Sequence, residues 1–463
     1  KERIMINKKT KIVCTIGPAS WDPTVLEKMI QNGMNCARVN GAFADSQELK
    51  KVADTIRALS SEVSLMIDVK GPEIRLNKFA APLDLATQSE VVIGQKDLDP
   101  IFIANYPDTY QFISVGQKSA VGDGDVILKV KKVEDKKIYC EVEVGEMLKP
   151  GKALNIPGIK VSREILTEKY ISNLKTAIQL GYNFVSASFV QNALAAKQIK
   201  EAAGDSSIKL IAKIEYQEGI NNIDEILQEV DGIMIARGGL GVELGLEKVP
   251  MVQRCLTERA IYVAKPVITA TQMLESMTTN PVPTRAEVND VETAVILGSD
   301  AVMLSGETSA GEYPDLAVKQ MSDIIISTEH TIKNYNFQIS GNKLLDPNMI
   351  QLSNNVIENI FKDTSLSMII IKASDASFSR YLSGKGINIP VYFFTEDHKS
   401  ALELSLSRGN TRSFYIDNLN TLTEEQKIDE IIKILDLNNL RQRTGLPVLY
   451  IDAKHGVIQT LRM

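Results

Sequence analysis

Eight short apolar segments recur along the first 304 residues, and helical patterns alternate with them. The segments are residues 11–15, 35–39, 65–69, 183–188, 209–213, 232–236, 266–269 and 301–304. Continuous Val, Ile, Ala and Met runs are typical of parallel strands buried on both faces. Eight such strands alternating with helices predict an α/β fold with a (β/α)8 TIM barrel, in which functional residues gather at the carboxyl ends of the strands. The pattern therefore indicates an enzyme.

Polar and charged residues stand at or just past the ends of these segments, where the barrel mouth is expected: Arg38, Asn40, Asp68, Lys70, Ser188, Lys213, Glu215, Arg237, Thr271, Ser305 and Glu307. Lys213 and Glu215 are two residues apart on a strand and point to the same side. There the glutamate can bind a hard cation while the lysine holds an anionic oxygen. Arg38, Arg75 and Lys213 could surround a phosphoryl group, whose transfer depends on positioning and charge neutralisation. An ion pair at the barrel rim is the alternative for any single pair.

The strand–helix alternation is interrupted after residue 75 and ends near residue 333. Between Leu76 and Ile156, period-two alternation with turn residues predicts a small antiparallel β domain inserted over the active face, as a lid. Beyond a polar connector at 340–347, a helical pattern at 349–361 and apolar runs at 368–371, 391–394, 414–416 and 448–451 predict an open α/β sheet. We expect a barrel at 1–75 and 157–333, a lid at 76–156 and a C-terminal domain at 334–463.

Composition narrows the choice of partners. The chain has 463 residues, with 52 basic and 58 acidic side chains and a net charge of −6, which argues against nucleic acid or a membrane surface as partner. No apolar run reaches the roughly 18 residues of a membrane span, and the basic segment 1–9 lacks the apolar centre of a signal peptide. We therefore expect a cytoplasmic protein. The four widely spaced cysteines show no metal-binding pattern.

Several strand-end strings are distinctive. They are Lys11-Ile12-Val13-Cys14-Thr15-Ile16-Gly17-Pro18-Ala19-Ser20, Asp68-Val69-Lys70-Gly71-Pro72-Glu73-Ile74-Arg75, the segment from Thr269 to Met277, and Leu304-Ser305-Gly306-Glu307-Thr308. Together they closely resemble the pyruvate kinase family, and the resemblance covers essentially the whole chain. It implies phosphoryl transfer from phosphoenolpyruvate to ADP in glycolysis, a divalent metal (Mg²⁺ or Mn²⁺), K⁺, a small β-barrel lid and a homotetramer.

The resemblance also implies roles for individual residues at the catalytic centre. Lys213 would stabilise the phosphoryl group in flight, and Thr271 would belong to the proton relay for the enolate. Arg38 would hold the phosphate, with Gly238 and Gly239 also contacting the substrate.

Cation and nucleotide roles follow from the same resemblance. Glu215 would bind Mg²⁺, and Asn40, Asp68 and Val69 would contact K⁺. The residues implied for nucleotide binding are Arg75, Asn40 and Lys152.

The chain departs from the family pattern at cation ligands. The family's Ala-Arg-Gly-Asp-Leu-Gly is here Ala-Arg-Gly-Gly-Leu-Gly, so Gly239 replaces an aspartate that binds Mg²⁺. Mg²⁺ can still bind through one carboxylate with substrate oxygens and water. The family's serine ligand of K⁺ is missing from the segment 41–44. Val69 replaces a threonine, but a backbone carbonyl at this position would survive the change. Glu73 matches the glutamate of the family pattern. Gly122 replaces an aspartate in the lid.

These departures leave two interpretations open: an active pyruvate kinase, or a weakly active or inactive paralogue with a regulatory or assembly role. A third, from another reaction class, is a barrel enzyme acting on a related enol or keto acid without phosphoryl transfer. The serines of the loop 372–379 could bind an effector phosphate or merely cap a helix, and we do not expect activation by a sugar phosphate. All three histidines lie outside the strand-end cluster.

Overall fold

The computed structural model describes residues 8–71, 74–96, 101–122, 124–157, 166–331, 366–373, 389–440 and 447–462, with short pieces between 351 and 387. Several predicted features lie outside these residues: the connector 340–347, most of the helix predicted at 349–361, Glu73, Asp123, and loop residues 374–377 and 379. Among the described residues, no helix is both long enough and apolar enough to cross a membrane.

Eight parallel strands close into a barrel, which confirms the predicted fold class. The order around the barrel is β1-β16-β15-β14-β13-β12-β3-β2. Each predicted apolar segment forms most of one strand. The strands are β1 (Lys11–Ile16), β2 (Cys36–Asn40), β3 (Ser64–Val69), β12 (Phe184–Ala187), β13 (Lys209–Ile214), β14 (Gly232–Ala236), β15 (Val267–Ala270) and β16 (Ala301–Leu304).

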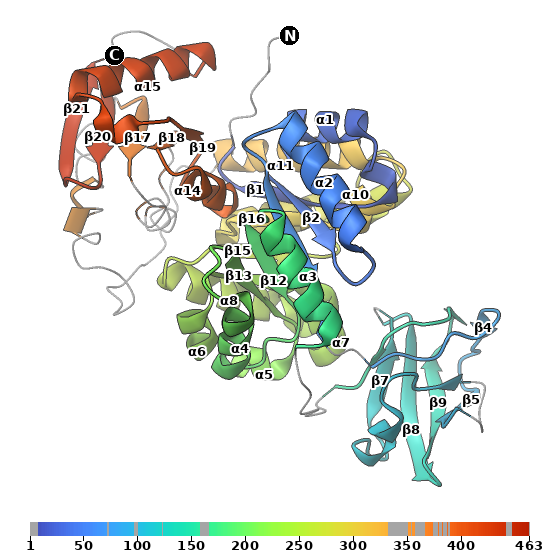
Figure 1. The fold of residues 1–463 in the computed structure, drawn as a ribbon. Coiled ribbons are helices and arrows are strands. Elements are labelled where there is room, and N and C mark those ends of the chain that lie inside the picture. Colours follow the sequence, from blue (N-terminus) through green and yellow to red (C-terminus); the bar gives the residue numbers. More distant parts are fainter. Residues whose placement is uncertain are drawn as a thin grey trace.

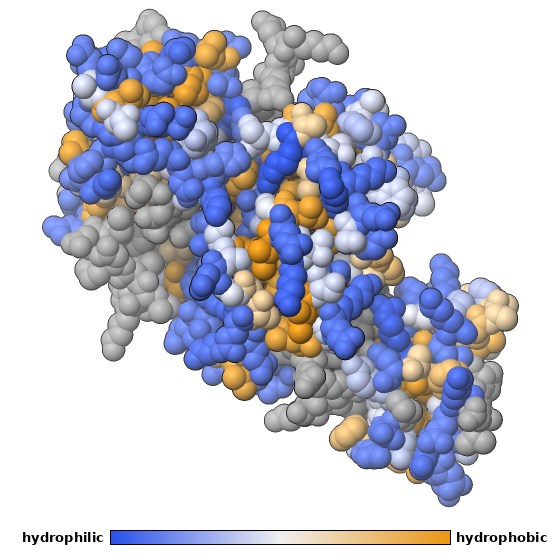
Figure 2. All heavy atoms as spheres, in the orientation of Figure 1, coloured by the Kyte–Doolittle hydropathy of each residue, from blue (hydrophilic) through white to orange (hydrophobic). Residues whose placement is uncertain are grey.

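Helices surround the barrel and bury its outer face. They are α1 (Pro23–Gln31), α2 (Ser46–Leu59), α3 (Glu168–Gln179), α4 (Ala193–Ala203), α5 (Gln217–Asn221), α6 (Ile223–Glu229), α7 (Arg237–Leu244), α8 (Val249–Tyr262), α9 (Arg285–Leu297), α10 (Gly306–Ser309) and α11 (Pro314–Thr331). Side-chain caps fix where several begin, as Asp45 does for α2 and Thr284 for α9. Hydrophilic side chains cover much of the visible face (Figure 2).

The segment between β3 and α3 forms a separate β unit that projects from the barrel (Figure 1). A six-stranded sheet has the order β11-β7-β8-β9-β5-β6, open at both edges among the described residues, and β10 and β4 pair separately. The strands are β4 (Leu83–Asp84), β5 (Glu90–Gly94), β6 (Ile101–Phe102), β7 (Lys118–Val121), β8 (Val126–Glu134), β9 (Lys137–Val144), β10 (Met147–Leu148) and β11 (Leu154–Asn155). This unit has its own apolar core.

A second α/β unit follows the barrel. Its sheet has the order β19-β18-β17-β20-β21, parallel except for the antiparallel pair β20–β21. The elements are β17 (Met368–Lys372), β18 (Val391–Thr395), α14 (His398–Glu403), β19 (Arg412–Tyr415), α15 (Glu424–Leu437), β20 (Pro447–Asp452) and β21 (Val457–Arg462). The four predicted apolar runs all fall in or against these strands.

Short 3₁₀ turns complete the described elements. They are η1 (Pro18–Ser20), η2 (Pro107–Gln111), η3 (Leu246–Lys248), η4 (Glu275–Thr278), η5 (Leu404–Leu406) and η6 (Leu419–Thr421). Leu406 of η5 is fully buried with the side chains that fill the barrel interior, among them Val13 and Met66. The C-terminal unit therefore contributes a side chain to the core of the barrel.

Candidate active site

Asp68, near the end of β3, lies at the centre of a buried charge cluster at the barrel mouth. Its Oδ2 atom accepts hydrogen bonds from Nη2 and Nε of Arg38, at 2.5 and 3.1 Å. Lys213 Nζ lies 3.4 Å from the same oxygen. Arg38 Nη1 also donates to the hydroxyl of Thr15 at 2.8 Å. These groups come from the strands β1, β2, β3 and β13, and they meet because the carboxyl ends of barrel strands converge at one mouth.

Lys213 is buried but surrounded by oxygens. Its ammonium group donates to Ser188 Oγ at 2.7 Å and lies 2.8 Å from Glu215 Oε1. Burial alone would lower the pKa of Lys213, but Asp68 and Glu215 outweigh burial and raise it. Burial would likewise raise the pKa of Asp68, but Arg38 and Lys213 hold it below its ordinary value. Asp68 and Lys213 are thus both charged at neutral pH, and Lys213 presents a fixed positive group to an anion.

Asp68 also carries a buried oxygen, Oδ1, that has no hydrogen-bond partner among the residues that the structure describes. A desolvated carboxylate oxygen left in this way fits a bound cation, since buried polar atoms are otherwise paired. The other predicted K⁺ ligands fit less closely. Asn40 Oδ1 already accepts from the Ala42 amide at 3.1 Å, and the Val69 carbonyl accepts from the Ser188 amide at 3.1 Å. Each oxygen keeps one further lone pair for an ion.

Glu215 is the carboxylate predicted to hold a divalent metal. Gly239, on the first turn of α7, faces it: a Cβ atom at position 239 would lie 3.2 Å from the Cβ of Glu215. No group of three or more His, Cys, Asp or Glu side chains with metal-binding geometry occurs in the described part of the chain. The donor set therefore fits Mg²⁺ only as one carboxylate completed by substrate oxygens and water, a manner of binding that Mg²⁺ accepts.

Thr271 lies in a strained turn just after β15. Its φ is 71° and that of Gln272 is 51°, so two successive residues with side chains occupy the left-handed region. Such a conformation costs about 1–3 kcal/mol per residue and persists only where the surroundings impose it. The Thr271 hydroxyl accepts from the Gly238 amide at 2.8 Å and donates to the Ala270 carbonyl at 2.6 Å. Both bonds fix the direction of the hydroxyl group.

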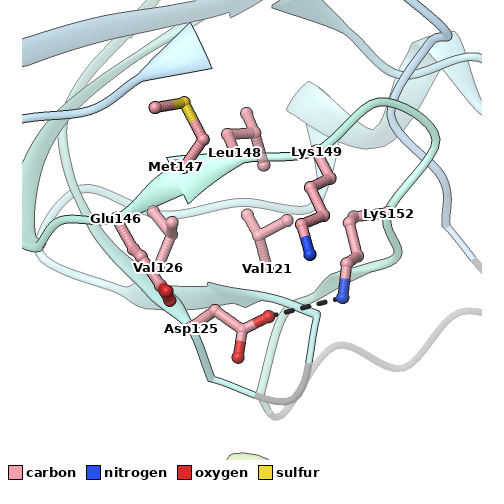
Figure 3. A pocket seen from close by; sticks show the side chains of 8 residues that line it. All are labelled: Val121, Asp125, Val126, Glu146, Met147, Leu148, Lys149 and Lys152. Atoms are coloured by element: carbon pink, nitrogen blue, oxygen red, sulfur yellow. Dashed lines mark hydrogen bonds and ion pairs between the residues drawn. The ribbon is translucent and has the colours of Figure 1, made fainter. Parts of the chain in front are cut away.

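Arg75 and Lys152 lie apart from this cluster, in and beside the inserted β unit. Arg75 forms an isolated bridge with Ala153, and its Nη1 donates to the Gly151 carbonyl at 2.9 Å. Lys152 lines a polar pocket of about 160 Å³ in the inserted unit and lies 3.4 Å from Asp125 (Figure 3). The structure thus brings together Arg38, Asp68, Lys213 and Glu215, with Gly238, Gly239 and Thr271 alongside. Of the three residues predicted to bind nucleotide, Asn40 pairs with Asp68 at the barrel mouth, whereas Arg75 and Lys152 lie at and in the inserted unit.

The sequence argument left three contributors without a role. Thr15 and Ser188 orient Arg38 and Lys213, respectively. Ser188 is among the strand-end residues named from the sequence but has no role assigned there, and Thr15, near the end of β1, fits the same rule. Glu307 is fully buried and accepts hydrogen bonds from the amides of Leu274 and Ser305 at 3.0 and 2.7 Å. Burial raises its pKa, and its contacts show that it supports the loops after β15 and β16.

Comparison with known proteins shows that the similarity to one family extends beyond the site to most of the chain. Residues 7–318 match the family model described as pyruvate kinase, barrel domain. A pyruvate kinase of Staphylococcus saprophyticus is 38% identical over 416 residues, which is 87% of this chain and 71% of that protein. One from Geobacillus stearothermophilus is 42% identical over 341 residues, covering 71% of this chain and 58% of that protein.

A solved structure is similar over almost the full length. A pyruvate kinase from Cryptosporidium parvum superposes with a TM-score of 0.89 at 29% identity, covering 98% of this chain and 96% of that one. The similarity therefore includes the inserted β unit and the C-terminal sheet as well as the barrel.

Proposed function

This chain belongs to the pyruvate kinase family, and from that premise we propose how its residues carry out phosphoryl transfer from phosphoenolpyruvate to ADP. The P–O bond to the enolate oxygen breaks, and a P–O bond to the terminal oxygen of ADP forms. The enolate then takes a proton at carbon to give pyruvate. Little covalent chemistry is left to the protein, so positioning and charge neutralisation provide the catalysis.

Lys213 and Arg38 are the groups that neutralise the transferred phosphoryl. Lys213 Nζ is held by Ser188, Asp68 and Glu215 within 3.4 Å, so it does not have to be reoriented as negative charge develops. Arg38 is similarly fixed by Asp68 and Thr15. Preorganised charges of this kind stabilise a transition state more than flexible ones do. The buried, fixed ammonium of Lys213 is the single observation that carries the proposal.

Thr271 is the proposed member of the proton relay to the enolate carbon. Its hydroxyl is directed by Gly238 and Ala270, and no histidine belongs to the cluster described above. Gly238 and Gly239 begin α7 beside this hydroxyl and are the proposed backbone contacts of the substrate.

Cations complete the proposed site. Glu215 would hold a divalent ion, which would supply Lewis-acid polarisation of the phosphoryl oxygens. For K⁺ the proposed ligands are Asp68 Oδ1, Asn40 and the Val69 carbonyl. Because Gly239 supplies no carboxylate, we expect the Mg²⁺ requirement to be higher than two carboxylates would give. Arg75, Asn40 and Lys152 remain the proposed nucleotide contacts, reached as the inserted unit approaches the mouth.

The proposed assembly is carried over from the family, and the proposed domain limits come from the pattern of the sequence. A cytoplasmic, glycolytic homotetramer is the proposed setting. The proposed domains are a barrel at 1–75 and 157–333, a lid at 76–156 and a C-terminal domain at 334–463.

A coupled assay of pyruvate release tests the proposal. With millimolar Mg²⁺ or Mn²⁺ and K⁺, pyruvate formation should require ADP and should collapse in Lys213→Met. Equal inactivity of the wild type and the variant would instead favour a paralogue with an assembly role. Turnover of oxaloacetate without nucleotide would favour the third interpretation, a barrel enzyme without phosphoryl transfer.

A further inference from the structure

The side chain of Arg237 lies directly behind the strained turn that carries Thr271. Its Nη2 donates to the carbonyls of Thr271 and Gln272 at 2.6 and 3.0 Å, and its Nε donates to the Thr271 carbonyl at 3.2 Å. Thr271 and Gln272 are the two residues of this turn that have a positive φ. One guanidinium group therefore holds both carbonyls of the left-handed turn.

Arg237 is itself anchored from the opposite side. Nη1 lies 2.6 Å from Asp290 Oδ2 on α9 and 3.4 Å from Gln253 Oε1 on α8. The guanidinium is buried, whereas Asp290 is about one-third exposed. Charge-assisted bonds to a planar, five-donor group fix its orientation in a way that a lysine cannot reproduce.

The same short segment also holds the hydroxyl group of Thr271. Arg237 is the first residue of α7, and the amide of the next residue, Gly238, donates to Thr271 Oγ1 at 2.8 Å. Helix α9 also contacts the loop after β15: Glu287 accepts hydrogen bonds from the amide and hydroxyl of Ser276 at 2.7 and 2.5 Å. Contacts from α7 and α9 therefore hold the turn in the left-handed conformation, which its own residues disfavour.

We propose that Arg237, anchored by Asp290, is a positioning residue that keeps the Thr271 hydroxyl aimed at the substrate carbon. It touches no reacting atom and acts through the backbone of the turn. The inference rests on the proposed role of Thr271 in protonating the enolate. It predicts that loss of the clamp slows proton transfer much more than it weakens substrate binding.

Deuterium uptake at the methyl group of pyruvate in D2O, followed by proton NMR with Mg²⁺, K⁺ and ATP, reports on the proton-transfer step. We expect Arg237→Lys to slow this exchange about 10- to 100-fold, while the KM for phosphoenolpyruvate stays within about threefold. Asp290→Asn should give a smaller loss in the same direction. Asp290 borders a cavity of about 230 Å³, so an asparagine in its place does not crowd the core.

A double-mutant cycle separates positioning from a general structural role. Combined with Thr271→Ala, Arg237→Lys should cause no further loss of exchange, because both changes remove the same interaction. Independent, additive losses would overturn the proposal. Arg259→Lys is the matched control, since Arg259 pairs with Asp224 at 3.3 Å on the exposed surface and should leave exchange unchanged.

The outcomes distinguish this inference from the function on which it rests. If the wild type neither forms pyruvate nor exchanges its protons, the proposed function fails. If the wild type exchanges protons and Arg237→Lys matches it, only the positioning role fails. Thermal unfolding of each variant checks that a loss of exchange does not come from a loss of fold.

Discussion

Gly239 faces Glu215 across the first turn of α7, and a Cβ atom at position 239 would lie 3.2 Å from the Cβ and 3.5 Å from the Cγ of Glu215. The backbone of Gly239 is outside the left-handed region, so a residue with a side chain is not strained there. The neighbouring glutamate would have to move by only a few tenths of an ångström. A carboxylate placed at 239 would therefore stand beside Glu215, where both could bind one cation.

Gly239→Asp should lower the Mg²⁺ concentration that half-saturates turnover by about tenfold or more, equivalent to roughly 1.4 kcal/mol of binding free energy. The reason is that a second carboxylate replaces water in the coordination shell of a hard cation. Steady-state kinetics at saturating phosphoenolpyruvate and ADP, with Mg²⁺ varied, measures the effect. The thermal midpoint of the variant should also rise more steeply with Mg²⁺ than that of the wild type.

Gly239→Asn is the control for the Gly239→Asp experiment, since it adds a side chain of equal size without the charge. It should leave the Mg²⁺ requirement within about threefold of the wild-type value, because a neutral amide oxygen is a weaker ligand than a carboxylate. An equal gain in both variants would mean that packing, and not charge, limits metal binding. No gain in either would mean that Glu215 is not the metal ligand.

Lys213→Met should reduce pyruvate formation by about a thousandfold or more, as expected on removing a preorganised charge from a transition state. Lys209→Met provides a matched control on the same strand. Lys209 pairs with Glu403 at 3.4 Å at the opposite end of β13, so its loss should leave turnover unchanged. A similar loss in both variants would show that β13 had been disturbed and that the effect is not specific to the mouth.

The strands of the barrel could be predicted because each is buried on both faces and so reads as a continuous apolar run. The edge strand β21 (Val457–Arg462) was not predicted, because it is antiparallel, none of its residues is buried, and its sequence contains no such run. Long, periodic features of the chain thus gave the architecture, and short exposed ones did not.

Residue types at strand ends likewise predicted which side chains meet at the mouth, but not how they pair. That Asp68 joins both Arg38 and Lys213 depends on side-chain geometry. The left-handed turn at Thr271 could not be predicted either. A β-branched residue disfavours positive φ, and the conformation is held by long-range contacts, among them that from Arg237, which the sequence does not reveal.

The buried pair of Asp68 and Lys213 should contribute a constant stability between about pH 5 and 9. Folding lowers the pKa of Asp68, so its contribution is complete above 3.8 and is lost as the pH falls through the lower folded value. Folding raises the pKa of Lys213, so its contribution is complete below 10.5 and is lost as the pH rises through the higher folded value. Neither group titrates within the window.

Asp68→Asn tests this pH dependence. Breaking a buried ion pair costs about 3–5 kcal/mol, and the difference in urea midpoint between wild type and variant should stay level from pH 5 to 9 and narrow below about pH 4. Asp54→Asn is the control, because Asp54 forms an exposed pair with Lys50 and should shift the midpoint little at any pH. A step within the window would show that Asp68 or Lys213 titrates there.

Leu406→Ala should destabilise the barrel although Leu406 belongs to the C-terminal unit. Leu404 packs in the core of the C-terminal sheet, whereas Leu406, two residues later, is fully buried with the interior side chains of the barrel. Truncating it leaves a cavity that neither unit can easily close, at a cost of about 2–5 kcal/mol. The first thermal transition should therefore fall by several degrees.

Leu437→Ala is the control for this prediction: it truncates a side chain that is 75% exposed and should leave the transition unchanged. An unshifted transition in Leu406→Ala would show that the barrel does not depend on the C-terminal unit for its interior packing.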